Sequence, residues 1–231
     1  MNKTKILIVD DEIDIIEFLT MYLEAEKFHV LYACNGHDAL KLVKEENPAL
    51  IILDILLPGM DGLEICEKIR KLSISPIIFL SCKSEELDKI QGLKVGGDDY
   101  ITKPFSPREL IARVNAHLRR TNLIKTTITH EKIISLNSIQ IYLDKHEVFI
   151  NNKPIRLSAK EFDLLVFLAK NPGKVFSLEK LFEEIWNMDN MGDTRTVMVH
   201  ISNLRRKLEE TPSKPKYIIT IKGAGYKFNN I

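Results

Sequence analysis

The sequence has little cysteine and no long apolar run. Its three cysteines are odd in number and include no C-x-x-C pair. This argues against a disulfide framework and a zinc site, and we expect three buried, reduced thiols. No stretch approaches the roughly 18 apolar residues that a membrane span needs. The first apolar run is too short for a signal peptide and ends in three acids, so we expect a cytoplasmic protein with no membrane partner.

Internal repeats, low-complexity tracts and a large net charge are also missing. The 231 residues carry a net charge of +1, with 45% hydrophobic and 28% charged residues, which is typical of a globular protein. The length suits two domains of about 100–120 residues each. The small net charge hides an acidic first half (1–120) and a basic second half (121–231). Nucleic acid is therefore a candidate partner of the second half.

The first half alternates short apolar runs with amphipathic stretches. The runs lie at 6–9, 30–33, 50–53, 76–80 and 100–101, and helical patterns lie near 12–26, 37–46, 61–72, 84–95 and 107–120. Continuous apolar runs separated by helices indicate buried parallel strands. We therefore predict an α/β doubly wound, five-stranded parallel sheet over residues 1–121.

The second half has a different rhythm. Residues 122–132 show no strong period and are interpreted as a linker. Short alternating strands are expected at 139–143, 147–150 and 154–157, and a capping box at 158–161 opens a helix that ends near 169. Helices at 178–186 and 194–209 and a hairpin over 216–228 follow. Three helices and a terminal two-stranded wing predict an α+β winged helix-turn-helix domain over 133–231.

Polar side chains follow four strands of the predicted sheet. Asp10 and Asp11 follow the first, Asp54 ends the third, Ser81 ends the fourth and Lys103 follows the fifth. These positions share the sheet edge where such folds bind ligands. Clustered carboxylates repel one another unless a cation is present, and Mg²⁺ suits this donor set. Asp54 could then attack phosphorus, while Lys103 and Ser81 hold the phosphoryl oxygens.

The segments 8–12, 53–62 and 98–105 resemble the signature segments of response-regulator receivers. The resemblance implies that Asp54 is the phosphoacceptor, and that Asp10, Asp11, Asp54 and the Leu56 carbonyl bind Mg²⁺. It also implies a cis peptide bond between Lys103 and Pro104. Ser81-Cys82 replaces the Thr-Ala that is frequent in the family, which keeps the hydroxyl but removes the methyl that stiffens χ1.

The same resemblance implies a switch and a dimer. Ser81 and Tyr100 are the expected switch pair, which phosphorylation biases between two states. The output face is expected to pair across a two-fold axis, with Lys89 meeting Glu109 of the second copy and Asp99 meeting its Arg113. Asp98 is assigned to the same face. The alternative interpretation is a solvated surface of mixed charge.

The expected helix at 195–208 carries an apolar stripe, Val197, Ile201, Leu204 and Leu208. The opposite side is predicted to expose six residues: Arg195, Thr196, Val199, Ser202, Asn203 and Arg206. Asn203 could bond adenine and Val199 could touch a thymine methyl. Phosphate contacts or positions near the phosphates are expected for Arg195, Thr196, Arg205, Arg206 and Trp186, and Lys222 could reach a minor groove.

Segments 194–208 and 223–228 closely resemble the OmpR/PhoB winged helix, and the whole chain also resembles VanR-like regulators. The resemblance implies a transcription factor that a sensor histidine kinase phosphorylates, with double-stranded promoter DNA, RNA polymerase and a second copy as partners. We expect no enzyme activity beyond slow self-dephosphorylation. Three alternatives stay open: a phosphotransfer or scaffold protein without a DNA role, a true phosphohydrolase, and a phosphate-independent regulator.

Overall fold

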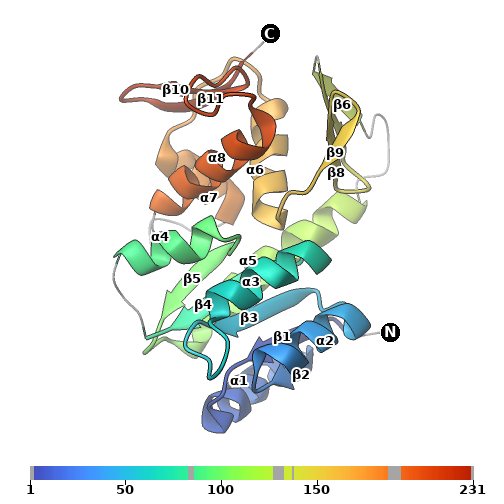
Figure 1. The fold of residues 1–231 in the computed structure, drawn as a ribbon, viewed down its shortest axis with the longest axis vertical. Helices are drawn as coiled ribbons and strands as arrows, with labels where there is room; N and C mark the ends of the chain where they lie inside the picture. Colours follow the sequence, from blue (N-terminus) through green and yellow to red (C-terminus); the bar gives the residue numbers. More distant parts are fainter. Residues whose placement is uncertain (1–2, 83–85, 127–132, 137, 187–193, 230–231) are drawn as a thin grey trace. The chain divides into compact units, whose positions relative to one another are not determined.

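The computed structural model describes residues 3–82, 86–126, 133–136, 138–186 and 194–229. The chain divides into two compact units, Met1–Leu118 and Arg119–Ile231. Each unit has its own sheet and helices (Figure 1).

The first unit is a five-stranded parallel sheet in the order β2-β1-β3-β4-β5. The strands are β1 Lys5–Val9, β2 His29–Ala33, β3 Leu50–Asp54, β4 Ile77–Ser81 and β5 Asp99–Thr102. The helices are α1 Ile13–Ala25, α2 Gly36–Glu46, α3 Gly62–Leu72, α4 Glu86–Lys94 and α5 Pro107–Thr126. The predicted doubly wound sheet is confirmed.

Two apolar cores cover the two faces of this sheet. On one face, Ala39 and Val43 of α2 and Ile65 and Ile69 of α3 pack on the strands. On the other face, residues of α1 and α5 do so, among them Ile16, Leu19, Leu110 and Val114. Every residue of β3 and β4 is buried, as expected for central parallel strands. The rigid interior holds the carboxyl ends of the strands in fixed positions.

Beyond the end of α5, the described residues of the second unit form three helices and two antiparallel sheets. Its strands are β6 Ile133–Leu136, β7 Ile139–Tyr142, β8 Glu147–Ile150, β9 Lys153–Ile155, β10 Ile218–Ile221 and β11 Gly225–Phe228. Its helices are α6 Ala159–Ala169, α7 Leu178–Trp186 and α8 Arg195–Leu208. The predicted winged-helix plan is confirmed, and β6 is an additional strand. The predicted capping box is present, since Ser158 and Glu161 bond each other's backbone N–H groups.

Residues 122–132 differ from the expected linker. α5 continues through Thr126, six residues beyond its predicted end, and residues 127–132 lie outside the described part of the chain. Residues 121–126 contain no proline or glycine, so nothing in the sequence breaks the helix there. The first two residues of the helix predicted at 84–95 are likewise outside the described part.

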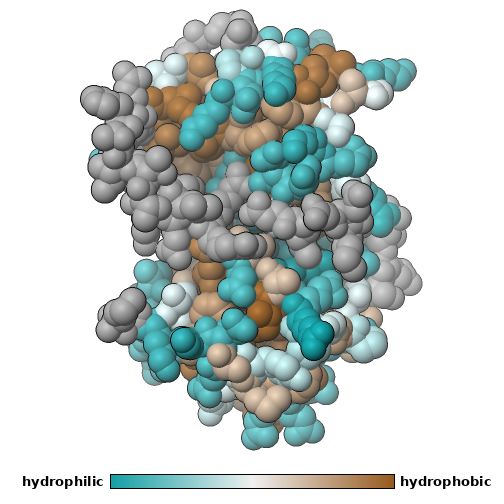
Figure 2. Space-filling view, turned by 180° about the vertical axis from the view of Figure 1, so that it is seen from behind, coloured by the Kyte–Doolittle hydropathy of each residue, from teal (hydrophilic) through white to brown (hydrophobic). Residues whose placement is uncertain are grey.

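The described helices include no candidate for a membrane span. None of them is long and apolar enough to cross a bilayer. Figure 2 shows hydrophilic and hydrophobic side chains interspersed on one face of the molecule. Such mixing is ordinary for a globular surface, where scattered apolar side chains require no special explanation.

Candidate functional site

The predicted polar residues meet at the carboxyl edge of the first sheet. Asp10 follows β1, Asp54 is the last residue of β3, Ser81 is the last residue of β4 and Lys103 follows β5. Asp10, Asp54 and Ser81 are 1%, 5% and 0% exposed. Buried polar groups at one edge require partners that offset their desolvation, so their contacts define what the pocket can bind.

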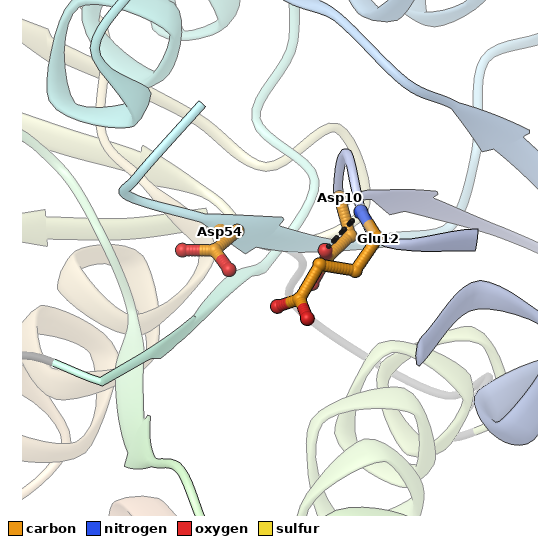
Figure 3. A group of neighbouring side chains, drawn as sticks. All are labelled: Asp10, Glu12 and Asp54. Carbon is orange, nitrogen blue, oxygen red and sulfur yellow. Dashed lines mark hydrogen bonds between the residues drawn. The ribbon is translucent and has the colours of Figure 1, made fainter. Parts of the chain in front are cut away.

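Three carboxylates form a cluster in this pocket. Asp10, Glu12 and Asp54 each have an oxygen within 4.8 Å of the others (Figure 3). The Glu12 backbone N–H donates to Asp10 Oδ1 at 3.0 Å, which fixes the turn after β1. Asp11, predicted as a metal ligand, is exposed and lies outside this cluster. The prediction did not include Glu12, although a third acid directly after Asp11 could have indicated it.

Lys103 supplies the positive charge of the pocket. Its Nζ donates to Asp54 Oδ2 at 2.6 Å and to Asp10 Oδ2 at 2.9 Å, and it lies 3.3 Å from Glu12 Oε1. Burial tends to lower the pKa of Lys103, but the hydrogen bonds and charges of Asp54 and Asp10 outweigh it and raise the pKa above its usual value. The ammonium group is therefore a permanent cation at the centre of the cluster.

The backbone around the pocket also orients Asp54. The Leu56 N–H donates to Asp54 Oδ1 at 2.8 Å, so the two oxygens of this carboxylate have different partners. The Leu56 side chain is 52% exposed, and its predicted role belongs to its backbone carbonyl. The Lys103–Pro104 peptide bond is cis, as the resemblance implied.

The donor set fits a divalent metal ion. One ammonium group only partly neutralises three carboxylates, and burial raises the pKa of Asp10, against the hydrogen bond from Lys103. Mg²⁺ prefers a few carboxylate oxygens, with carbonyl, water and phosphate oxygens in the remaining positions. Asp10 and Asp54, with Glu12 nearby, offer such oxygens in one place.

The two residues of the expected switch pair are in contact. The Tyr100 hydroxyl shares a side-chain hydrogen bond with the buried Ser81, and burial raises the pKa of Tyr100 to about 12. The Tyr100 ring lies 6.2 Å from that of Phe79. Tyr100 is thus a neutral phenol that touches the pocket through Ser81.

One of the two residue pairs predicted to meet across the dimer, Asp99 and Arg113, is in contact within the chain. Arg113 Nη1 lies 3.0 Å from both carboxylate oxygens of Asp99, and its Nη2 lies 2.8 Å from Glu109 Oε1. Asp99 and Arg113 are 4% and 7% exposed. The prediction overlooked that α5 packs beside β5 and brings Arg113 to Asp99 of the same chain.

Asp98 does not lie on the output face as predicted. It is 0% exposed and accepts hydrogen bonds from Arg70 Nη2 at 2.5 Å and from the Ile77 N–H at 2.9 Å. Arg70 also donates to the carbonyls of Gly96 and Ser75. Asp98 therefore joins the end of α3 to the start of β4. Lys89, by contrast, is half-buried on α4.

The expectation of three buried thiols is partly wrong. Cys66 is buried, and burial raises its pKa to about 12. Cys34 is half-buried and Cys82 is exposed. Cys82 follows the last residue of β4, and residues just beyond a strand leave the protected interior.

In the second unit, α8 buries the predicted stripe Val197, Ile201, Leu204 and Leu208. Of the side chains predicted to be exposed, Arg195, Ser202 and Arg206 are exposed. Exposure was wrongly predicted for Thr196, Val199 and Asn203, which are 7%, 7% and 3% exposed. The helical period gives only the angle of a side chain from the stripe and not what else covers the helix. The side-chain amide oxygen of Asn203, Oδ1, accepts a hydrogen bond from Nη2 of Arg206.

Two other predicted DNA contacts have structural partners. Trp186 is 1% exposed, stacks on Phe182 and lies 5.2 Å from the His200 ring, so it belongs to the core rather than to the surface. Its bulk and apolarity favour burial over an exposed contact. Arg205 is half-buried and bonds the wing, formed by β10 and β11. Lys222, at the turn of the wing, is exposed.

Comparisons with known proteins cover both units. The model of the response regulator receiver domain matches residues 6–115, and that of the transcriptional regulatory protein C terminus matches residues 152–228. The chain is 44% identical to the transcriptional regulatory protein ResD of Bacillus subtilis over 231 residues, which are 98% of this chain and 96% of that protein. It is also 44% identical to SrrA of Staphylococcus aureus, over 97% of this chain and 95% of that protein.

Solved structures agree with this assignment. A structure of a RitR mutant matches with a TM-score of 0.81 at 27% identity, over 99% of this chain and 100% of that one. DrrB of Thermotoga maritima, described as an OmpR/PhoB homolog, matches with a TM-score of 0.52 at 34% identity, over 99% and 100%. The chain therefore belongs to the OmpR/PhoB family of two-component response regulators, with a receiver domain followed by a DNA-binding winged helix that regulates transcription.

Proposed function

We propose that this regulator accepts a phosphoryl group on Asp54 from a sensor histidine kinase, and that the resulting acyl phosphate controls dimerisation and promoter binding. The observation that carries the proposal is the meeting of Asp10, Asp54 and Lys103 in one buried pocket, with the Lys103 ammonium 2.6 Å from Asp54. Strongly clustered charges of this kind are typical of functional sites.

The chain's own residues supply a nucleophile and a cradle for the phosphoryl group. A carboxylate oxygen of Asp54 attacks phosphorus as the phosphorus–nitrogen bond of a phosphohistidine breaks, and the departing imidazole keeps the electron pair and takes up a proton. Lys103 and the Ser81 hydroxyl donate hydrogen bonds to the phosphoryl oxygens. Phosphoryl transfer depends mainly on positioning and charge neutralisation, so these few groups suffice.

Asp10 and Asp54 would hold Mg²⁺, with Glu12 beside them. When bound, Mg²⁺ neutralises the charge of the carboxylates and of the incoming phosphoryl oxygens. The roles of Asp11 and of the Leu56 carbonyl, implied by the family resemblance, remain part of the proposal.

Dimerisation is proposed on the face formed by α4, β5 and α5. Glu109 has a side chain that is 42% exposed, and Lys89 is half-buried, so this pair is accessible to a second copy. The Asp99–Arg113 pair, already closed within the chain, would have to open or be shared to join the interface. Glu109→Lys should weaken phosphorylation-dependent dimerisation in sedimentation measurements, and an unchanged dimer would contradict this part of the proposal.

DNA binding by the second unit is proposed to use α8 and the wing. The exposed side chains Arg195, Ser202, Arg206 and Lys222 are suited to phosphate and groove contacts. Base reading by Asn203 and Val199 requires that these side chains become accessible. Asn203→Ala should then relax specificity at one base pair. Equal losses on specific and random duplexes would refute that role.

The remaining parts of the proposal concern the setting and the fate of the phosphoryl group. A promoter-bound dimer would contact RNA polymerase, and these partners place the protein in the bacterial cytoplasm. The acyl phosphate is lost by slow attack of water, and no further enzyme activity is proposed. Accordingly, label from phosphoryl donors should decay without a phosphatase, while sustained multiple turnover of acetyl phosphate would favour a phosphohydrolase.

Labelling tests the central step. The full chain is incubated with radiolabelled acetyl phosphate and MgCl₂, as wild type, as Asp54→Asn and as Asp61→Asn. Asp61 is a matched control, because it is a nearby aspartate that caps α3 through the Leu63 N–H. We expect Asp61→Asn to be labelled like the wild type and Asp54→Asn to remain unlabelled. Equal labelling of Asp54→Asn would overturn the proposal.

A further inference from the structure

The wing is joined to α8 by two charged side chains from the last turns of that helix. Arg205 Nε and Nη2 donate to the Ile218 carbonyl at 3.0 and 2.7 Å, and Nη2 also donates to Thr220 Oγ1 at 2.7 Å. The guanidinium lies 5.6 Å from the centre of the Tyr226 ring. Three of the five N–H donors of this arginine are therefore directed at β10, and its charge lies close to an aromatic ring of β11.

Glu209 holds the start of the same hairpin. This residue caps α8 and is 7% exposed. Its Oε2 accepts the Lys216 N–H at 2.7 Å, and its Oε1 accepts the N–H groups of Tyr217 and Ile218 at 2.9 and 3.0 Å. A carboxylate that receives three backbone N–H groups forms strong, charge-assisted hydrogen bonds. The chain is thus fixed to α8 immediately before β10 begins.

A two-stranded hairpin has little stability of its own in water. The wing gains an apolar anchor at its base, where Ile218 and Phe228 are 0% and 1% exposed. An isolated bridge between Phe176 and Tyr226 adds a second attachment. This apolar anchor belongs to the same core as the buried stripe of α8, and such packing is not directional. Arg205 and Glu209 add directional hydrogen bonds between the end of α8 and β10, which are suited to setting the angle between the wing and the DNA-reading helix.

We propose that Arg205 is a positioning residue for DNA recognition, which with Glu209 sets the wing against α8, and that it contributes to affinity through the wing rather than through a phosphate contact. This replaces the phosphate role predicted from the sequence. It rests on the DNA-binding function of the second unit. A lysine at this position keeps the charge but lacks the rigid fork that reaches two acceptors, so it cannot fulfil the positioning role.

The test uses the full chain and one duplex that the wild-type protein enriches from a random-sequence pool. Affinity is measured for Arg205→Met and Arg205→Lys, each with and without Lys222→Ala. We expect both Arg205 variants to bind more weakly and to similar extents. Because a misplaced wing no longer brings Lys222 to the DNA, the loss caused by Lys222→Ala should shrink by at least about twofold in both backgrounds.

Arg206→Lys is the matched control. Arg206 is the neighbouring exposed arginine, and its hydrogen bond runs to Asn203 of the same helix, so Lys222→Ala should cause its full loss of affinity in that background. Wild-type affinity of Arg205→Lys, or an undiminished effect of Lys222→Ala in the Arg205 backgrounds, would overturn the proposal. If the second unit did not bind DNA at all, the wild-type protein would enrich no duplex from the pool. That result would contradict the proposed function and differs from a failure of the Arg205 proposal, in which the wild-type protein still enriches a duplex.

A second pair of variants covers the case in which the Arg205 variants do not fold. Thr220→Val removes one acceptor of the guanidinium from the wing side, while Thr220→Ser keeps the hydroxyl. We expect Thr220→Val to bind DNA more weakly and to reduce the effect of Lys222→Ala. Its thermal unfolding should remain cooperative, which shows that it is folded, and Thr220→Ser should behave like the wild type. Wild-type binding by Thr220→Val, or an undiminished effect of Lys222→Ala in that variant, contradicts the proposal.

Discussion

Replacing Lys103 by methionine should increase the affinity of the receiver for Mg²⁺. The Lys103 ammonium lies 2.6 Å from Asp54 and 2.9 Å from Asp10, and its side chain is only 9% exposed. It therefore competes with any metal ion for the same two carboxylates. Unit charges about 4 Å apart repel by about 1 kcal/mol in water and about 4 kcal/mol at an effective dielectric constant of about 20, and a divalent ion doubles these values. Even about 2 kcal/mol exceeds the roughly 1.4 kcal/mol that corresponds to a tenfold change in affinity, so the gain should be at least about tenfold.

The same substitution should destabilise the receiver in the absence of metal. Removing one partner of a buried ion pair leaves uncompensated carboxylates and costs roughly 3–5 kcal/mol. Mg²⁺ at about 100 times its dissociation constant restores about 2.7 kcal/mol. Calorimetric titration and thermal unfolding over a Mg²⁺ series, well above the carboxyl pKa values, measure both effects. Lys68→Met is the control, because Lys68 pairs with Glu64 on the exposed side of α3. Unchanged or weaker Mg²⁺ binding in Lys103→Met would refute the competition argument.

Three further predictions concern stability. Arg70→Met should destabilise the receiver by roughly 3–5 kcal/mol in urea unfolding, because it leaves the carboxylate of Asp98 buried without its cation; a loss below about 1 kcal/mol would show that water reaches this carboxylate. Gly225→Ala should lower the melting temperature of the winged helix, because φ is +125° and an added Cβ would overlap the Phe176 carbonyl; an unchanged melting temperature would contradict this. Burial tends to raise the pKa of Asp99, but the hydrogen bond from His117 and the charge of Arg113 lower it below the ordinary value of 3.8. The ionised Asp99 therefore stabilises the folded state above pH 3.8, and this stabilisation is lost as the pH falls toward the lower pKa of the folded protein. Unfolding measured below about pH 4 should therefore depend less steeply on pH in Asp99→Asn, and equal slopes would oppose the assignment.

The sequence by itself determined the two folds and most of the pocket. Short continuous apolar runs that alternate with amphipathic helices indicate buried parallel strands, and the chain direction then places Asp10, Asp54, Ser81 and Lys103 at one sheet edge. The sequence also predicted which apolar side chains of α8 are buried, because the helical period selects the side chains that face a core. These features depend on local pattern and connectivity, which the order of residues contains.

Only the tertiary structure decided which charges pair and which polar side chains are covered. Glu12 lies in one carboxylate cluster with Asp10 and Asp54, Asp99 pairs with Arg113 of its own chain, and Arg205 turns to the wing. Each outcome depends on a few ångströms between residues that are distant in sequence or on which way a side chain turns. Electrostatic and hydrogen-bond energies change steeply over such distances, whereas the periodic pattern of a sequence carries no information about them.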